Sequence, residues 1–287
     1  MVIATLIAAG RLDESIVRAA ADRVGAAEWR WLDQGDAADL TLTGDPRAAR
    51  IALEDAFPGV DVVVQAAEHR VKRLLVADMD STMITVECID ELADYAGLKP
   101  EIAAVTERAM RGELDFAAAL DARVALLKDL EETAIDRCLA ERVTDTPGAA
   151  ILVRTMRRMG ALTLLVSGGF TRFAEPVGAR LGFERVVANR LEVADGRLTG
   201  TVTKPIVDSG TKEAALRDAA AGRGLALAET LAVGDGANDL PMIRAAGLGV
   251  AYRAKPVVAA AAGARIEHND LTALLWAQGI ARAAWTA

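Results

Sequence analysis

Cysteine, histidine and long apolar runs are scarce in this sequence, and each shortage excludes a class of protein. Only two cysteines, Cys88 and Cys138, and two histidines, His69 and His268, occur among the 287 residues. This excludes a disulfide framework, a cysteine-rich zinc site and a histidine metal site, and it fits a reducing compartment. No apolar run approaches the roughly 20 residues that a membrane-spanning helix needs.

Basic residues are also fewer than acidic ones. Lysine and arginine number 33 against 41 aspartate and glutamate residues, so the formal net charge is -8. Nucleic acids are bound through basic patches, and the sequence shows none, so we expect no nucleic-acid partner. The apolar residues 1–10 lack a basic leader region, and we interpret them as a strand rather than a signal sequence. We therefore expect a cytoplasmic protein without a membrane partner.

The order of patterns predicts a small first domain over residues 1–70. Strand-like and helical runs alternate there as βαββαβ, which predicts a ferredoxin-like α+β fold. Asp45 and Pro46 fit the N-cap and first position of a helix over 46–56. The domain resembles ACT-type domains, which often accompany amino-acid enzymes. We favour a structural or oligomerising role for it, such as forming a homodimer, over effector binding, because fold alone does not imply function.

The rest of the chain predicts an α/β core interrupted by helices. Helices and apolar strands alternate over 71–85 and 148–287, whereas 86–147 is helical in pattern. We therefore expect an α/β fold in which a Rossmann-like, doubly wound parallel sheet carries a helical cap, inserted after its first strand. Such a cap would lie over the carboxyl ends of the strands and exclude water.

Two carboxylates, Asp78 and Asp80, end the apolar run 74–77 abruptly. Just past the carboxyl end of a parallel strand, they can hold a cation and present one oxygen as a nucleophile. A solvated Asp-x-Asp turn explains this segment about as well when it is taken alone. Three later segments favour the chemical interpretation.

Two of these segments offer donors to an anion. The apolar strand 161–166 runs into Ser167, Gly168 and Gly169, whose backbone N–H groups and hydroxyl can approach an anion closely. Lys212 lies near the start of a predicted helix, where its charge opposes the helix dipole unless an anion is nearby. Taken alone, the Ser-Gly-Gly segment could be an ordinary turn, and Lys212 could be a surface lysine.

The last segment supplies more oxygen ligands. Asp235, with Asp78 and the backbone carbonyl of Asp80, provides the few hard ligands that Mg²⁺ takes from protein, leaving positions for water and phosphate. Asn238 and Asp239 would surround these ligands. Gly-Asp-Gly is a common turn, but another strand end bearing carboxylates is hard to explain by turns.

Together the four segments resemble the haloacid dehalogenase superfamily of phosphotransferases. Its Asp-x-Asp-x-Thr signature matches residues 78–82, and its Ser, Lys and Gly-Asp-x-x-x-Asp elements follow in order. The resemblance covers about residues 71–260. It implies that Asp78 attacks phosphorus to form an aspartyl-phosphate, and that Asp80 protonates the leaving alcohol and then activates water.

The cap carries residues that suit a small zwitterion. Met110 and Phe116 offer an apolar wall, Arg123 can clamp a carboxylate through two hydrogen bonds, and Glu87 can receive an ammonium group. An exposed helical arginine and a helix N-terminal glutamate are the ordinary explanations of the two charges.

These cap residues, together with Ser167-Gly-Gly-Phe170 and residues 254–256, narrow the resemblance to the phosphoserine phosphatase family. That family uses Mg²⁺ to release serine and phosphate from O-phospho-L-serine, the last step of serine synthesis. The resemblance assigns the ammonium to Glu87, the carboxylate to Arg123 and the phosphate to Ser167, Gly168 and Lys212. It places Met110, Phe116, Gly169 and Asn238 at the substrate. Met79 and Arg253 depart from the family pattern without touching the chemistry.

Two other hypotheses compete with this interpretation. The same site could pass the phosphoryl group to another alcohol, such as homoserine, and the sequence does not separate this from hydrolysis. A non-catalytic amino-acid sensor would show damage among Asp78, Asp80, Lys212 and Asp235, and all four are intact.

Overall fold

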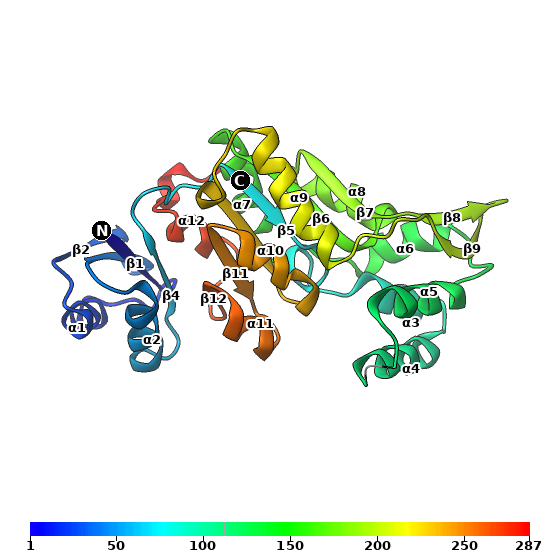
Figure 1. Ribbon diagram of the computed structural model, residues 1–287, viewed down its shortest axis with the longest axis horizontal. Helices are drawn as coiled ribbons and strands as arrows, with labels where there is room; N and C mark the ends of the chain where they lie inside the picture. The colour runs from blue at the N-terminus through cyan, green and yellow to red at the C-terminus, as the bar shows by residue number, and fades with distance from the viewer. Residues whose placement is uncertain (112) are drawn as a thin grey trace.

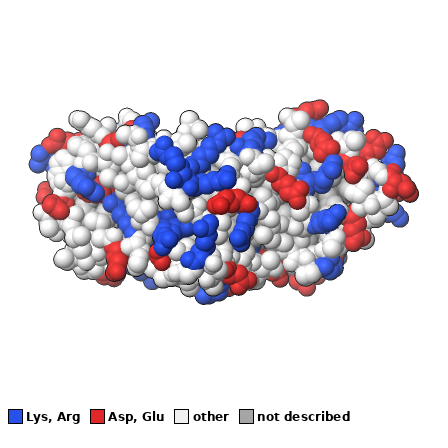
Figure 2. Space-filling view, turned by 90° about the horizontal axis from the view of Figure 1, so that it is seen from above, with Lys and Arg blue, Asp and Glu red and all other residues white. Residues whose placement is uncertain are grey.

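The computed structural model of the protein describes residues 1–111 and 113–287 and is elongated (Figure 1). A small antiparallel sheet lies at one end, a parallel sheet in the middle and the helices α3 to α6 at the other end. No helix in the part of the chain that the structure describes is long and apolar enough to cross a membrane. Figure 2 shows acidic and basic side chains side by side on one face, with basic ones gathered near its middle.

The amino-terminal elements follow the expected βαββαβ order. They are β1 (Val2–Ile7), α1 (Glu14–Val24), β2 (Glu28–Asp33), β3 (Ala37–Leu42), α2 (Pro46–Ala56) and β4 (Asp61–Ala66). The strands form an antiparallel sheet in the order β2-β3-β1-β4. Asp45 caps α2 by accepting the backbone N–H of Arg47, as its place before Pro46 predicts. The expected ferredoxin-like α+β fold of these residues is confirmed.

The core is a parallel six-stranded sheet with helices on both faces. Its strands are β5 (Leu74–Ala77), β6 (Leu162–Phe170), β7 (Arg185–Asn189), β10 (Thr230–Gly234), β11 (Leu248–Tyr252) and β12 (Ala264–Ile266). Its helices are α7 (Ala149–Arg158), α8 (Thr171–Leu181), α9 (Ser209–Gly222), α10 (Leu240–Ala245), α11 (Pro256–Ala261) and α12 (Ala273–Ala277). The expected doubly wound fold is therefore confirmed.

Alternate residues of β5 explain why both faces need helices. Leu74 and Val76 pack with Leu216 of α9 on one face, whereas Leu75 and Ala77 belong to the apolar cluster on the other. In the strand order β12-β11-β10-β5-β6-β7, the chain leaves β5 for β6 on one side and later returns to β10 on the other. Ligands bind at such a switch point, outside the carboxyl ends of the strands.

The cap helices are α3 (Cys88–Tyr95), α4 (Lys99–Met110), α5 (Phe116–Leu126) and α6 (Thr133–Arg142). A hairpin that the sequence did not predict, β8 (Leu191–Ala194) and β9 (Arg197–Val202), is hydrogen-bonded to the segment after α5. The N–H of Asp129 donates to the carbonyl of Leu198, whose own N–H donates to the carbonyl of Leu130. The hairpin thus ties the cap to the core, and our boundaries at 70, 85 and 147 stay a prediction.

The open face of the amino-terminal sheet packs on the core through buried polar contacts. Arg70 donates to both carboxylate oxygens of Asp39, at 2.6 and 2.7 Å, and also to the carbonyl of Ala277. Asp61 accepts the backbone N–H groups of Glu267, His268 and Asn269. Because unpaired buried polar groups are costly, this network fixes the small domain to residues 267–282.

Lys72, in the segment that joins β4 to β5, should make the stability of the protein depend on pH. Its side chain is 5% exposed and donates to the carbonyls of His69 and Ala228, and burial lowers its pKa from 10.5 to about 8. Between these two pH values the unfolded chain binds more protons than the folded one, so the free energy of unfolding should rise with pH, by about 3 kcal/mol from this group.

Denaturant unfolding of the wild-type protein and of Lys72→Met from about pH 7 to about pH 11.5, roughly one unit beyond each of the two pKa values, checks this expectation. The stability of the wild type relative to the variant should increase across the window. A difference that does not change with pH would contradict it.

Candidate active site

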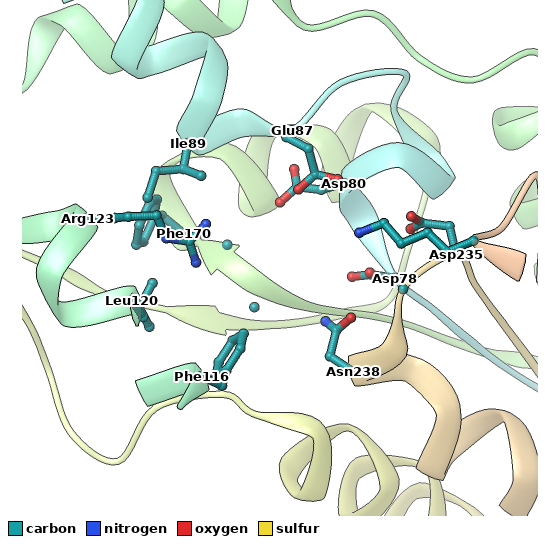
Figure 3. Close-up of a pocket in the computed structure, with 14 residues that line it drawn as sticks. Asp78, Asp80, Glu87, Ile89, Phe116, Leu120, Arg123, Phe170, Asp235 and Asn238 are labelled. Atoms are coloured by element: carbon teal, nitrogen blue, oxygen red, sulfur yellow. The ribbon is translucent and has the colours of Figure 1, made fainter. Parts of the chain in front are cut away.

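One pocket lies where the sheet's switch point meets the cap (Figure 3). Its lining residues are Asp78, Asp80, Glu87, Ile89, Phe116, Leu120, Arg123, Gly168, Gly169, Phe170, Asp235, Gly236, Asn238 and Lys255. Most of the predicted site residues are among them. Ser167, Lys212 and Asp239 are 0% exposed and lie behind this lining. Met110 ends α4, but its side chain lies outside the described residues.

Asp78 is held at the end of β5 by its own backbone. Its N–H donates to the carbonyl of Val233 in β10, and its Oδ1 accepts the N–H of Met79 at 2.8 Å. The chain then turns sharply, with Ser81 at a left-handed φ of 53° that residues other than glycine seldom adopt. The Ser81 hydroxyl donates to Glu87 at 2.6 Å. This strained turn therefore links the strand end to the start of the cap.

Lys212 bridges two buried carboxylates. Its Nζ lies 2.6 Å from Asp78 Oδ1 and 2.7 Å from Asp239 Oδ1. Burial alone would lower the pKa of Lys212, but the two carboxylates outweigh it and raise that pKa. The pKa of Asp78 is raised by burial and by the neighbouring Asp239. A single lysine thus does not neutralise the acidic groups gathered here.

The excess negative charge identifies a place for a cation. Carboxylate oxygens of Asp78, Asp235 and Asp239 all lie within 4.8 Å of one another, and burial raises the pKa of Asp235 to about 6. Both carboxylate oxygens of Asp239 already have hydrogen-bond partners. Its Oδ1 accepts from Lys212, and its Oδ2 accepts the N–H groups of residues 235 and 236. Asp78 Oδ2 and Asp235 Oδ2 have no hydrogen-bond partner among the described residues. Two free, hard oxygens in an electron-rich site fit a divalent cation such as Mg²⁺.

Asp80 has the environment of a proton carrier. Burial, with a smaller contribution from the Glu87 carboxylate, raises its pKa to about 7, and its Oδ1 accepts the N–H of Cys88 at 3.2 Å. A Cβ atom at Gly169 would lie 2.9 Å from Asp80 Oδ2, so only glycine leaves this carboxyl its place. At neutral pH this group can both release and accept a proton.

The Ser-Gly-Gly segment lies within β6 rather than after it. The pairing of β6 with β7 is interrupted between Val166 and Phe170, and the Gly169 N–H donates to Ser167 Oγ at 2.9 Å. A Cβ atom at Gly168 would lie 3.2 Å from the ring of Phe116. This irregular strand end brings backbone close to both the pocket and the cap.

The cap side of the pocket carries one acid and one base (Figure 3). Arg123 is partly buried, and its Nε donates only to the carbonyl of Ala119, one helical turn away. It forms no salt bridge within the described residues. Phe116 remains 38% exposed at the pocket. A partly buried guanidinium without an ion pair is a ready carboxylate site.

Several residues at or beside the pocket have no individual signal in the sequence. Ile89 and Leu120 line the pocket, but their apolar positions in predicted helices are typical of core residues. Phe170 and Lys255 also line it, and the sequence indicates them only as members of the segments 167–170 and 254–256. Thr82, whose hydroxyl donates to Asp235 at 3.0 Å, is indicated only as the last residue of the Asp-x-Asp-x-Thr motif.

Comparison with known proteins places this geometry in a family. A model of the haloacid dehalogenase-like hydrolases matches residues 75–244. Phosphoserine phosphatase of Streptomyces coelicolor is 48% identical over 240 residues, which cover 83% of this chain and 58% of that protein. The chain thus spans little more than half of that relative's length.

Two further similarities cover most of the compared protein. Phosphoserine phosphatase of Streptococcus thermophilus is 48% identical over 201 residues, which cover 70% of this chain and 93% of that protein. A crystal structure of a probable phosphoserine phosphatase from Vibrio cholerae superposes with a TM-score of 0.81 at 33% identity, covering 99% of this chain and 88% of that one. The latter similarity includes the amino-terminal domain.

Proposed function

This chain belongs to the haloacid dehalogenase-like hydrolase family, in the group that contains the phosphoserine phosphatases, and we propose that it hydrolyses O-phospho-L-serine to L-serine and phosphate. The observation that supports this most is the opposition of two sets of charges across one pocket. Glu87 and Arg123 lie on the cap, and Asp78 with Lys212 lies on the core. A small molecule with an ammonium, a carboxylate and a phosphate suits these groups.

In the proposed mechanism the substrate is oriented by three contacts. Arg123 binds the carboxylate, Glu87 binds the ammonium, and the phosphate lies against Ser167, Gly168 and Lys212. Phe116, Met110, Gly169 and Asn238 would complete the enclosure. Such fixed orientation is itself a large part of the rate enhancement that enzymes achieve.

The proposed chemistry has two steps at Asp78. Its carboxylate attacks phosphorus, the bond to the serine oxygen breaks, and Asp80 gives its proton to the departing oxygen. Asp80 then takes a proton from water, which attacks the aspartyl-phosphate and frees phosphate. Lys212 keeps Asp78 in place and offsets charge on the transferring group. The raised pKa of Asp80, about 7, suits both proton transfers near neutral pH.

The metal belongs to the same proposal. Asp78, Asp235 and the backbone carbonyl of Asp80 would hold Mg²⁺, with Asp239 supporting them through Lys212. Bound there, the ion would supply positive charge to the phosphoryl oxygens. We also propose that the protein catalyses the last step of serine synthesis in the cytoplasm. It would form a homodimer and have no nucleic-acid or membrane partner.

A phosphate-release assay over a panel of phosphorylated metabolites, with and without Mg²⁺, tests the function. Phosphoserine should be preferred over esters that lack its carboxylate or ammonium, and a chelator should abolish release. Preference for another phosphate ester would overturn the substrate assignment. Product analysis with added homoserine separates hydrolysis from phosphoryl transfer, because transfer would yield a phosphorylated acceptor.

Replacing Arg123 tests the carboxylate contact. Arg123→Ala should raise KM for phosphoserine by about 10- to 100-fold, since a charged hydrogen bond contributes about 1.5–3 kcal/mol. KM for phosphoethanolamine, which has no carboxylate, should stay unchanged. Arg142→Ala is a matched control, because Arg142 is a cap arginine paired with Glu91 and Asp94 outside the pocket. Equal losses on both substrates would refute the contact.

A further inference from the structure

Asn189, at the end of β7, joins two segments of the proposed phosphate site from behind. Its side chain is 2% exposed, so both ends of its amide must find partners inside the protein. Nδ2 donates to the carbonyl of Gly168 at 2.8 Å, and Oδ1 accepts the N–H of Val207 at 2.7 Å. One partner is a carbonyl and the other an N–H group, which fixes the orientation of the amide.

The first hydrogen bond acts on Ser167 through one peptide unit. The carbonyl of Gly168 and the N–H of Gly169 belong to the same planar group, so fixing one end fixes the other. That N–H donates to Ser167 Oγ at 2.9 Å. Because the hydroxyl oxygen accepts there, its hydrogen must point elsewhere, and no acceptor for it lies among the described residues. The hydroxyl proton is thus left without a partner among the described residues, directly behind the pocket lining.

The second hydrogen bond acts on the helix that carries Lys212. Val207 directly precedes Asp208, whose carboxylate accepts the N–H of Thr211 and caps α9. Lys212 follows in the first turn of that helix. A shift of residue 207 would therefore move the start of α9 and the ammonium group that contacts Asp78.

We propose that Asn189 is a positioning residue, which through its two hydrogen bonds holds the Ser167 hydroxyl and the Lys212 helix in register around the phosphoryl group. This role rests on the proposed function, because it assumes that both elements bind phosphate. Asn189 itself is outside the pocket lining. It would therefore act on the substrate indirectly, through Ser167 and Lys212.

Two substitutions separate the two hydrogen bonds. Asn189→Asp keeps an oxygen for the Val207 N–H but places a second oxygen against the Gly168 carbonyl, and Asn189→Ala removes both contacts. Asn269 offers matched controls: it is also buried, donates to the carbonyl of Ile7 and accepts the N–H of Ala9, but it lies at the amino-terminal domain.

For Asn189→Asp we expect kcat for phosphoserine to fall by about 10- to 100-fold, as small misplacements of a binding group do. Inorganic phosphate should inhibit more weakly, whereas the half-saturating Mg²⁺ concentration should not change, because Asn189 contacts none of the acidic groups. Asn189→Ala should lose more. Asn269→Asp and Asn269→Ala should keep wild-type kcat.

A double-mutant cycle with Ser167→Ala gives the sharpest result. If Asn189 acts through the hydroxyl, adding Asn189→Asp to Ser167→Ala should cost little further kcat. Independent, additive losses would overturn the proposal, as would wild-type kcat and phosphate inhibition in Asn189→Asp, or equal losses in the Asn269 controls.

Two measurements keep the test independent of folding and of the substrate assignment. In the wild-type protein, hydrogen exchange at the Val207 amide should be slow, because this N–H donates to Asn189. Fast exchange would contradict the proposed role of that hydrogen bond. If the wild type releases no phosphate from phosphoserine, the proposed function fails. Binding of inorganic phosphate, weaker in Asn189→Asp than in the wild type, would still support the positioning role, and equal binding would overturn it.

Discussion

Replacing Lys212 with methionine should abolish activity and lower the free energy of unfolding by about 3–5 kcal/mol in Mg²⁺-free buffer. Lys212 is 0% exposed and lies against Asp78 and Asp239, which are 5% and 0% exposed. Methionine fills a similar volume but leaves two buried carboxylates without their counter-ion. The cost comes from the unpaired charges rather than from lost packing.

Denaturant unfolding at neutral pH measures this effect, and Lys72→Met serves as the matched control. Both lysines are buried, but Lys72 donates to carbonyl groups and has no carboxylate partner among the described residues. Its replacement should destabilise the protein far less. Added Mg²⁺ should restore part of the stability of Lys212→Met, because a cation offsets the same carboxylates. Similar losses in the two variants would contradict this view of the site.

Asp78→Asn should reduce turnover of phosphoserine by at least about 10⁴-fold, the scale of losing a catalytic nucleophile. The amide has nearly the shape of the carboxylate but is a far weaker nucleophile. Although Asp78→Asn should lower activity, it should not lower the free energy of unfolding. Because burial and Asp239 raise the pKa of Asp78, removing its charge should leave the Mg²⁺-free protein as stable as the wild type or more so.

Steady-state kinetics over a range of Mg²⁺ concentrations distinguish the nucleophile from a metal ligand. Asp235→Asn should recover part of its activity as Mg²⁺ increases, because it weakens binding of the ion without removing the attacking group. Asp78→Asn should stay inactive at every concentration. Recovery of Asp78→Asn by Mg²⁺ would show that this residue only binds the metal.

The strand ends of the core could be predicted from sequence because each is marked by a change of residue type. Asp78 and Asp235 follow short apolar runs, and parallel strands bring their carboxyl ends to one edge of the sheet. The helix start at Lys212 was also found, but its burial was not. The residues around it, Ser209 to Glu213, are polar, and nothing local shows that Asp78 and Asp239, from two distant segments, enclose the ammonium group.

Features that depend on distant pairing left no local signal. The hairpin β8 and β9 consists of short strands with few buried residues, and it gains its place by pairing with the segment after α5. Asn189 is a single polar residue between Ala188 and Arg190, and its partners lie 21 and 18 residues away. Such side-chain contacts with backbone follow from the folded arrangement and have no sequence period.

The central claim is that the phosphoryl group passes through Asp78, and acid quenching of the wild-type protein during turnover of phosphoserine tests it most directly. Peptides from the quenched enzyme would be analysed by mass spectrometry under acidic conditions, which preserve acyl phosphates. The account predicts one added phosphoryl group on the peptide that contains Asp78, and its loss on treatment with hydroxylamine. A phosphoryl group on another residue, or steady turnover with no phosphorylated peptide, would contradict it.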